Sequence, residues 1–156
     1  MKKEKKIGSQ PVVIGSDHGG FKLKEAIVSL LKSKHIPVTD VGCFDENSVD
    51  YPLIASDVAG RVGSGRAARG ILICGTGIGM AMAANKVKGV RAAVCYDQYT
   101  ARMSREHNNA NLLALGGRTT PLAKAKKIVE IWLVTPFEGG RHERRVRQIM
   151  AQDKKR

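Results

Sequence analysis

Aromatic side chains are scarce in this chain of 156 residues: Phe, Trp and Tyr together make up 4% of it. Its core must therefore rest mainly on Val, Ile, Leu, Ala and Met. No apolar run approaches the roughly 20 residues that a membrane-spanning helix needs. The lysine-rich start, MKKEKKIGSQ, is not followed by the apolar segment of a secretory signal. These absences predict a globular protein of the cytoplasm with no role at a membrane.

Cysteine is also rare, and its spacing is not that of a metal site. The three cysteines, Cys43, Cys74 and Cys95, are odd in number and form no CxxC pair. Neither a disulfide framework nor a structural zinc site is expected from this pattern. Reduced thiols are the default in the cytoplasm, and one of the three could be reactive.

Acidic residues are outnumbered, since 27 Lys and Arg face 14 Asp and Glu, and the net charge is +13. Such a charge can indicate nucleic-acid binding. Residues 1–6 carry +3 and residues 141–156 carry +5, so the two ends hold 8 of the 13 charges. Neither end has aromatic residues between its charges to stack on bases. A small anionic substrate therefore fits at least as well as nucleic acid, which we do not expect as a partner.

Short apolar runs alternate with helical patterns along the chain. This alternation is typical of a parallel α/β sheet with helices on both faces. We expect a three-layer α/β/α sandwich around a five-stranded parallel, Rossmann-like sheet. It would form a single domain at 11–150, including a C-terminal helix, after a disordered basic tail at 1–10. The predicted strands are 11–16, 36–41, 70–74, 90–95 and 112–115.

Polar residues gather after several of these strands, where open parallel sheets bind their ligands. The three clusters, Asp17-His18, Cys74-Gly75-Thr76 and His107-Asn108, are predicted to converge there. Each also has a plainer interpretation. An aspartate is a common helix cap, and a lone histidine at a helix end often only interacts with the helix dipole.

The turn that follows the third strand, Gly75-Thr76-Gly77-Ile78-Gly79, has two interpretations. One is a dinucleotide site, since Asp97 follows about 20 residues later, but Met80 fills the third glycine position of G-x-G-x-x-G. The other is an anion-holding loop beside Cys74, whose thiolate could abstract a proton next to a carbonyl. Cys74 could equally be a small apolar residue at a strand end.

The basic C-terminal segment has two interpretations as well. Arg141, Arg144 and Arg145 could clamp a phosphate, because planar guanidinium groups bind it well. They could also form the solvated face of a helix, which is the interpretation that we prefer for Arg144.

Five stretches of the chain resemble the ribose-5-phosphate isomerase B family. That family includes allose-6-phosphate isomerase and the galactose-6-phosphate isomerase subunits. The resemblance runs from about Val12 to Ile149. The stretches are SDHGGFKLK (16–24), DYP (50–52), GILICGTGIGMAMAANKVKGVRA (70–92), SREHNNANLLALGGR (104–118) and FEGGRHERRV (137–146).

The resemblance implies an aldose–ketose isomerase that uses no metal and no organic cofactor. Cys74 would be the base that moves a proton between C2 and C1, with the Thr76 hydroxyl close to the reacting oxygens. His107 would open the furanose ring. The loop 75–79 would stabilise the enediolate, and several basic residues would hold the phosphate. The implied substrate-binding residues are Asp17, His18, Tyr51, Gly75, Gly77, Ile78, Gly79, Asn108, Arg118, Arg141 and Arg145.

The resemblance further implies a homodimer or homotetramer in which the segment 107–108 reaches the site of a neighbouring subunit. The reaction expected is the interconversion of D-ribose 5-phosphate and D-ribulose 5-phosphate. A six-carbon sugar phosphate, such as allose 6-phosphate or galactose 6-phosphate, is the alternative substrate. A basic nucleic-acid-binding protein and a catalytically silent sugar-phosphate sensor are more distant alternatives.

Overall fold

A single parallel sheet organises the computed structural model, which describes residues 10–155. The predicted basic tail therefore lies outside the described residues, except for Gln10. Five strands pair in the order β2-β1-β3-β5-β4, and every neighbouring pair is parallel. The strands are β1 (Val12–Ser16), β2 (Val38–Asp40), β3 (Arg69–Cys74), β4 (Ala92–Val94) and β5 (Leu112–Gly116).

Helices follow each strand, as the sequence pattern predicts. In the described chain they are α1 (Phe21–Ser33), α2 (Tyr51–Gly63), α3 (Ile78–Ala84), α4 (Gln98–Glu106), α5 (Leu122–Val134) and α6 (Arg141–Ala151), with a short 3₁₀ helix, η1 (Gln152–Lys155), at the end. None of these helices has both the length and the apolar character that crossing a membrane requires. Helix α3 ends at Ala84, and the next side chain, that of Asn85, bonds the backbone N–H and C=O of Ala92 in β4, at 2.8 and 3.0 Å.

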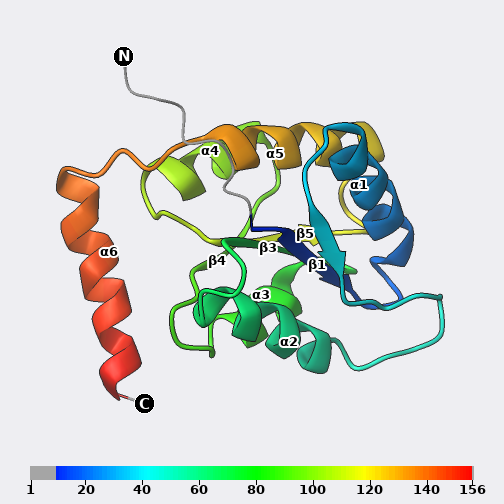
Figure 1. Cartoon of the computed structure of the whole chain (residues 1–156), viewed down its shortest axis with the longest axis horizontal. Helices are drawn as coiled ribbons and strands as arrows, with labels where there is room; N and C mark the ends of the chain where they lie inside the picture. The colour runs from blue at the N-terminus through cyan, green and yellow to red at the C-terminus, as the bar shows by residue number, and fades with distance from the viewer. Residues whose placement is uncertain (1–9, 156) are drawn as a thin grey trace.

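The sheet is covered on both faces, and alternate strand residues build two separate cores (Figure 1). On one face Ile71 and Ile73 of β3 pack with α1, α4 and α5, and this core includes the buried Trp132. On the other face Leu72 and Cys74 pack with α2 and α3. The predicted three-layer α/β/α sandwich is therefore confirmed, and the side chain of Cys74 belongs to the α2–α3 side.

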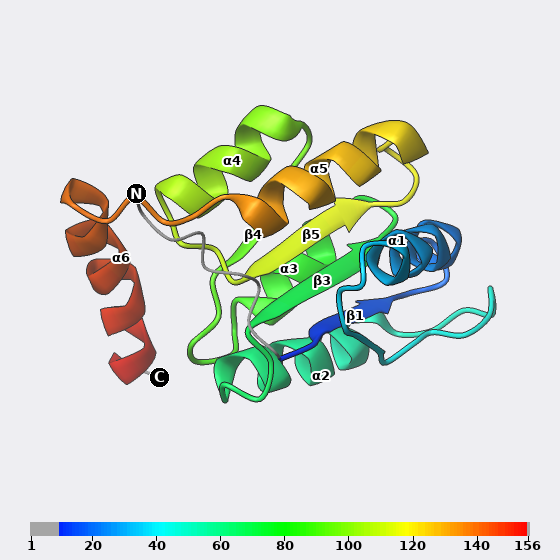
Figure 2. The same cartoon turned by 45° about the horizontal axis from the view of Figure 1, so that its top comes forward.

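Helix α6 stands apart from both layers (Figures 1 and 2). It lies beside the starts of the strands, while the strand tips point away from it. Two hydrogen bonds hold α6 and the following η1 to the rest of the chain: Arg91 Nη1 donates to Met150 Sδ of α6 at 3.2 Å, and the Gly89 N–H donates to Asp153 Oδ2 of η1 at 2.8 Å. Helix α6 covers no face of its own sheet. Its Val146 is buried, but its Ile149 is half-exposed and leaves apolar surface available to another molecule.

Candidate active site

The candidate site lies where the chain reverses its direction across the sheet. From β1 it moves outward to β2, then returns across β1 to β3. The crossover helices α1 and α2 lie on opposite faces, so the loops after β1 and β3 separate and leave a crevice. Asp17 follows β1 and Cys74 ends β3, and the Asp17 N–H donates to Ile73 O at 3.1 Å. The first two polar clusters predicted from the sequence therefore meet.

Cys74 is held against the glycine-rich turn that follows it. Its sulfur accepts a hydrogen bond from the Gly77 N–H at 3.1 Å, and the residue is only 5% exposed. The backbone of Gly77 is left-handed, with φ of 82°, which favours glycine, and an added Cβ there would lie 2.9 Å from the Leu115 carbonyl carbon. The hydrogen bond from Gly77 fixes the sulfur against the glycine-rich turn, at the border of the crevice.

The other two cysteines have different surroundings. Burial raises the pKa of Cys95 to about 11, and its thiol lies 3.7 Å from Ser104 Oγ in the core below α4. Cys43 donates from its thiol to Asp45 O at 3.2 Å. Of the three buried cysteines, Cys74 is the one whose sulfur accepts from a backbone N–H beside the crevice.

Asp17 and His18 have distinct local partners. The Asp17 carboxylate accepts from the Gly20 N–H at 3.1 Å, so it braces the turn that leads into α1. His18 accepts at Nδ1 from the Val49 N–H at 3.3 Å. An imidazole that accepts at Nδ1 carries its proton on Nε2, which can then donate to an anion. Sequence reasoning did not identify Val49, and a backbone N–H donor leaves no signal in the side-chain sequence.

Arg118 and Tyr51 border the same crevice. A side chain at Gly75 would lie 3.2 Å from Arg118 Nη1, so this exposed guanidinium covers the turn beside Cys74. Tyr51 opens α2, and its ring lies so close to Gly79 that an added Cβ would come within 2.8 Å. Both residues therefore flank the loop 75–79 from different elements.

The remaining members of the loop complete this rim. Thr76 and Ile78 are exposed, and Thr76 Oγ1 accepts from the Ile78 N–H at 3.3 Å. In one chain, the structure brings together these predicted site residues: Asp17, His18, Tyr51, Cys74, Gly75, Thr76, Gly77, Ile78, Gly79 and Arg118.

The third predicted cluster, His107-Asn108, does not join this group within one chain, so the convergence expected from topology holds here for the first two clusters alone. Helix α4 starts after the end of β4 and runs back toward the start of β5. His107, at its C-terminal end, therefore lies at the opposite edge of the sheet from Cys74 (Figure 2). Arg141 and Arg145 belong to the detached α6, on that same side.

At this opposite edge two histidines stack. The rings of His107 and His142 are 4.1 Å apart between centroids and 11° from parallel. His142 Nε2 lies 3.3 Å from Glu138 Oε2. Burial, His107 and Arg141 lower the pKa of His142, whereas Glu138 raises it. Sequence reasoning passed over His142, although its spacing of four residues from Glu138 was a readable signal.

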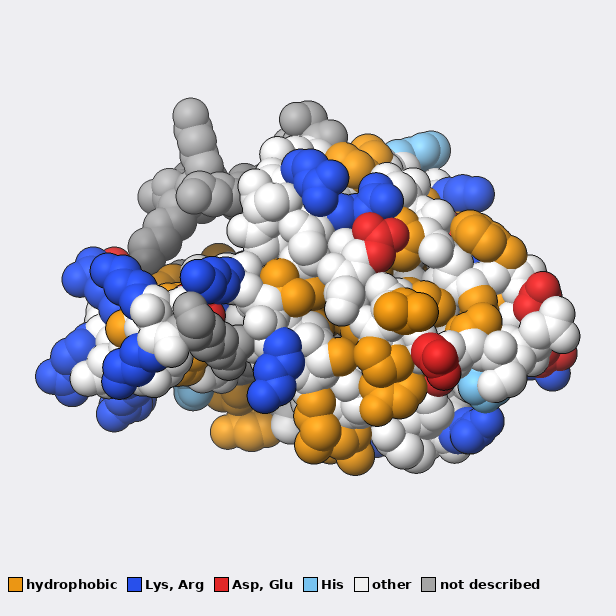
Figure 3. Space-filling model, turned by 90° about the horizontal axis from the view of Figure 1, so that it is seen from below, with side chains coloured by type: hydrophobic (Ala, Val, Ile, Leu, Met, Phe, Trp, Pro, Cys, Tyr) orange, Lys and Arg blue, Asp and Glu red, His pale blue; other side chains and the backbone are white. Residues whose placement is uncertain are grey.

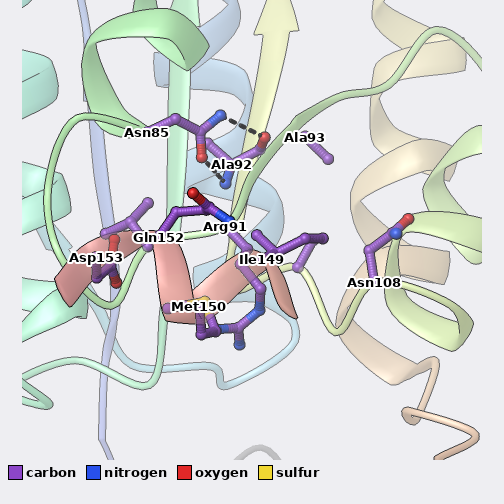
Figure 4. A pocket seen from close by; sticks show the side chains of 11 residues that line it. Asn85, Arg91, Ala92, Ala93, Asn108, Ile149, Met150, Gln152 and Asp153 are labelled. Atoms are coloured by element: carbon purple, nitrogen blue, oxygen red, sulfur yellow. Dashed lines mark hydrogen bonds between the residues drawn. The ribbon is translucent and has the colours of Figure 1, made fainter. Parts of the chain in front are cut away.

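Asn108 lines a cavity of about 380 Å³ between α6 and the start of β4 (Figure 4). The floor of this cavity carries Arg91 and the Asn85 side chain with its two bonds to Ala92. Ile149 and Met150 of α6 form its wall. The cavity is therefore built by the detached helix and does not reach Cys74 or its turn.

The dinucleotide interpretation gains no support from Asp97. Its carboxylate accepts from the Thr100 N–H at 2.7 Å and caps α4, and these hydrogen bonds lower the pKa of Asp97. A carboxylate committed to a helix cap is not presented to a ribose.

Comparisons with known proteins agree with this geometry. Residues 12–149 match the family model described as Ribose/Galactose Isomerase. Ribose-5-phosphate isomerase B of Escherichia coli (strain K12) is 47% identical, over 93% of this chain and 97% of its own.

Solved structures give the same result. The structure of Clostridium thermocellum ribose-5-phosphate isomerase B superposes with a TM-score of 0.92 at 53% identity, covering 93% of this chain and 98% of that one. The Mycoplasma genitalium enzyme, solved with bound ribulose-5-phosphate, gives a TM-score of 0.91 at 44% identity, covering 95% and 99%. By the extent and degree of these matches, the chain belongs to the ribose/galactose isomerase family.

Proposed function

We propose that this chain interconverts D-ribose 5-phosphate and D-ribulose 5-phosphate through an enediolate. The observation that carries the proposal is the hydrogen bond from the Gly77 N–H to Cys74 Sγ at the strand-end crevice. Similarity to ribose-5-phosphate isomerases B over nearly the whole chain supports the same reaction. The chain thus combines a thiolate base, an anion-holding loop and nearby cations for a phosphate.

In the proton-transfer step, the Cys74 thiolate removes a proton from C2 of the open-chain aldose, and negative charge develops on the enediolate oxygens. The O2 hydroxyl proton passes to O1, and the Cys74 thiol then returns its proton to C1, which leaves the ketose and the thiolate. The backbone N–H groups of the loop 75–79 and the exposed Thr76 hydroxyl are placed to receive the negative charge. Cys74 lies almost fully out of water, which strengthens these interactions.

Phosphate binding draws on both edges of the sheet. His18 offers its Nε2 proton and Arg118 its guanidinium from the Cys74 side. At the other edge, Arg141 and Arg145 are exposed on α6. The Asn108 side chain, just after α4, is exposed there too. One chain therefore carries two half-sites, and a complete site needs the second half from another copy. We propose a homo-oligomer in which His107 of one subunit opens the sugar ring in the site of its neighbour.

The molecular surface supports such an assembly. Figure 3 views the face made by α2 and α3, where apolar side chains lie beside one another. Leu53 is 73% exposed and Met82 66% exposed on these two helices, and Ile78 is half-exposed. Apolar clusters of this kind, together with a detached helix, are typical of subunit interfaces. With three free thiols and a phosphorylated sugar as substrate, the cytoplasm is the location that we propose.

The test is isomerisation of ribose 5-phosphate by the purified chain and by Cys74→Ala. Losing the base should lower kcat by about 10²- to 10⁴-fold, while binding of the sugar phosphate persists. Cys95→Ala is the matched control, because it removes a buried thiol outside the crevice and should keep near-normal kcat. Normal turnover by Cys74→Ala would rule out the base assignment.

The same assay separates the two candidate substrates. Ratios of kcat/KM for ribose 5-phosphate against allose 6-phosphate measure how the site treats one additional CHOH group. A ratio in favour of the hexose phosphate would replace the pentose as the substrate and leave the isomerase chemistry intact.

A further inference from the structure

The cluster His107, Glu138 and His142 has a chemical capacity that the isomerase reaction does not use. One ligand atom from each residue can be chosen so that all three lie within 4.8 Å of one another. Two imidazoles and a carboxylate form a common donor set for zinc and other late first-row metals. The His107 ring makes no hydrogen bond to another described residue, so its unprotonated nitrogen is available to a metal.

Two separate segments bring the three residues together. His107 ends α4, whereas Glu138 and His142 come from the connection into α6 and its first turn. The Glu138 N–H donates to Glu106 O at 3.1 Å, and this backbone bond fixes the second segment beside the first. His142 is 5% exposed and therefore held in place by its surroundings. The frame that carries the donors is thus fixed before a metal arrives.

The distances fit zinc after a modest rotation. Two ligands of a tetrahedral zinc lie about 3.3 Å apart, given zinc–nitrogen bonds of roughly 2.0–2.1 Å. His142 Nε2 and Glu138 Oε2 already lie 3.3 Å apart. The His107 ring is stacked on His142, so it must turn about its side-chain bonds to direct a nitrogen at the same point. His107 is only half-buried at a helix end, where this rotation is open to it.

The donor types select among divalent metals, and the local charges act on all of them alike. Arg141 and Arg145 act on His142 and oppose any cation at the site, while Glu138 favours one. A hard ion such as Mg²⁺ or Ca²⁺ gains little from imidazole and would be excluded. Zn²⁺, which binds imidazole strongly, can overcome this field.

We propose that His107, Glu138 and His142 form an inhibitory site for Zn²⁺. A bound Zn²⁺ would coordinate the His107 ring and so prevent it from opening the sugar ring. The zinc would stay in the +2 state throughout. The inhibition rests on the role proposed for His107 in turnover, whereas the binding itself does not. Zinc would therefore lower the isomerase rate reversibly, at a point remote from Cys74 in the same chain.

Binding is tested first, by calorimetric titration of Zn²⁺ into the untagged, EDTA-treated full chain. One site per chain is expected, and Mg²⁺ should give no heat of binding. Glu138→Gln and His142→Asn should each weaken zinc at least about tenfold, since even groups behind a metal's ligands are worth that much. Two control variants should leave the zinc affinity unchanged. Glu143→Gln removes a neighbouring negative charge on the exposed side of α6, and His35→Asn removes an exposed histidine elsewhere.

Turnover is tested next with ribose 5-phosphate. Zinc should reduce kcat, EDTA should restore it, and Glu138→Gln should retain basal turnover while needing at least about tenfold more zinc for the same inhibition. Zinc affinity that survives in both Glu138→Gln and His142→Asn, or that is lost in Cys74→Ser instead, overturns the site. If the chain turns over no ribose 5-phosphate, the proposed function fails, yet the calorimetry still decides the metal site.

Discussion

Three buried thiols in this chain illustrate how much the surroundings of a residue determine its chemistry. Cys74 receives a backbone N–H, Cys43 donates to a carbonyl oxygen, and Cys95 is enclosed by the core beside Ser104. The residue type is the same in each case. The difference arises from which element follows the cysteine, and Cys74 is followed by a glycine-rich turn whose Gly77 N–H donates to its sulfur.

The raised pKa of Cys95 predicts a specific loss of stability in alkali. The folded pKa of about 11 exceeds the ordinary value of 9.0, because burial disfavours the thiolate. The contribution of the neutral Cys95 thiol to the unfolding free energy is therefore complete below pH 9 and is lost as the pH rises through 11. At pH 10.5 the loss amounts to about 2 kcal/mol of unfolding free energy. Urea denaturation at pH 8 and pH 10.5, under reducing conditions, measures it.

Cys95→Ala should reduce the difference in unfolding free energy between pH 8 and pH 10.5 by about 2 kcal/mol. Val94→Ala, which removes a neighbouring group that does not titrate, serves as the control for lost packing. It should lower stability at both pH values and retain the pH difference of the wild type. An unchanged pH difference in Cys95→Ala would contradict the assignment.

At the scale of elements, α2 shows how a helix meets its neighbours through glycine. A Cβ at Gly60 would meet nothing within 4 Å, whereas a Cβ at Gly63 would lie 2.3 Å from the backbone oxygen of Lys88. The end of α2 is therefore packed directly against the loop after α3. The middle of the helix has room at Gly60 for a side chain.

This contrast predicts opposite effects for the same substitution within one helix. Gly60→Ala should stabilise the protein by about 0.5–1 kcal/mol, because alanine loses less backbone freedom on folding than glycine. Gly63→Ala should destabilise it by at least about 1–3 kcal/mol, because the backbone of the loop has to move. Thermal or urea unfolding of the two variants checks both signs. A stabilising Gly63→Ala would mean that α2 and this loop are not in contact.

At the scale of the whole molecule, the two proposed half-sites lie at opposite edges of one sheet. Cys74 and its loop lie at the strand ends, while His107, Asn108 and the arginines of α6 lie at the strand starts. A dimer related by a two-fold axis can join each half-site to the other half on the partner, which produces two complete sites.

Mixed dimers provide the test of this arrangement. Cys74→Ala and His107→Asn should each be nearly inactive alone. Coexpressed, they should recover about a quarter of wild-type activity, since random pairing makes half of the dimers mixed and each mixed dimer has one intact site. Cys74→Ala coexpressed with Thr76→Val is the control and should recover nothing, because both changes affect the same half-site. No recovery in the first pair would show that the site forms within one chain.

Much of this arrangement could be predicted from the sequence. The alternation of apolar runs and helical patterns gave the parallel α/β sandwich, because strand burial and helix amphipathicity are local properties of the chain. The match of residues 12–149 to the ribose/galactose isomerase family confirms the resemblance seen in five motifs. The meeting of Asp17 and Cys74 was also expected, since strand-end polar residues converge at a switch point of such a sheet. Tyr51 and Arg118, which flank the loop 75–79, were named by the family resemblance alone.

Burial at single positions escaped prediction, as Lys24 demonstrates. The helical pattern of α1 gives no reason to bury a lysine, yet Lys24 is fully buried with its Nζ 2.5 Å from Asp40 Oδ2. The Lys24 Nζ also lies 5.3 Å from the centroid of the Phe44 ring. These partners come from β2 and the loop after it, and proximity across the fold is not written in the local pattern.

The sequence by itself determined the type of each element, the family and the identity of the chemical groups, because these depend on side-chain pattern over short spans. The tertiary structure decided which groups meet. Helix α4 returns the chain to the start of β5 and so separates His107 from Cys74, and α6 leaves the sheet altogether. The physical reason is that a parallel sheet places the end of each crossover helix at the edge opposite the strand ends, so residues that are near in chemistry lie far apart in one subunit.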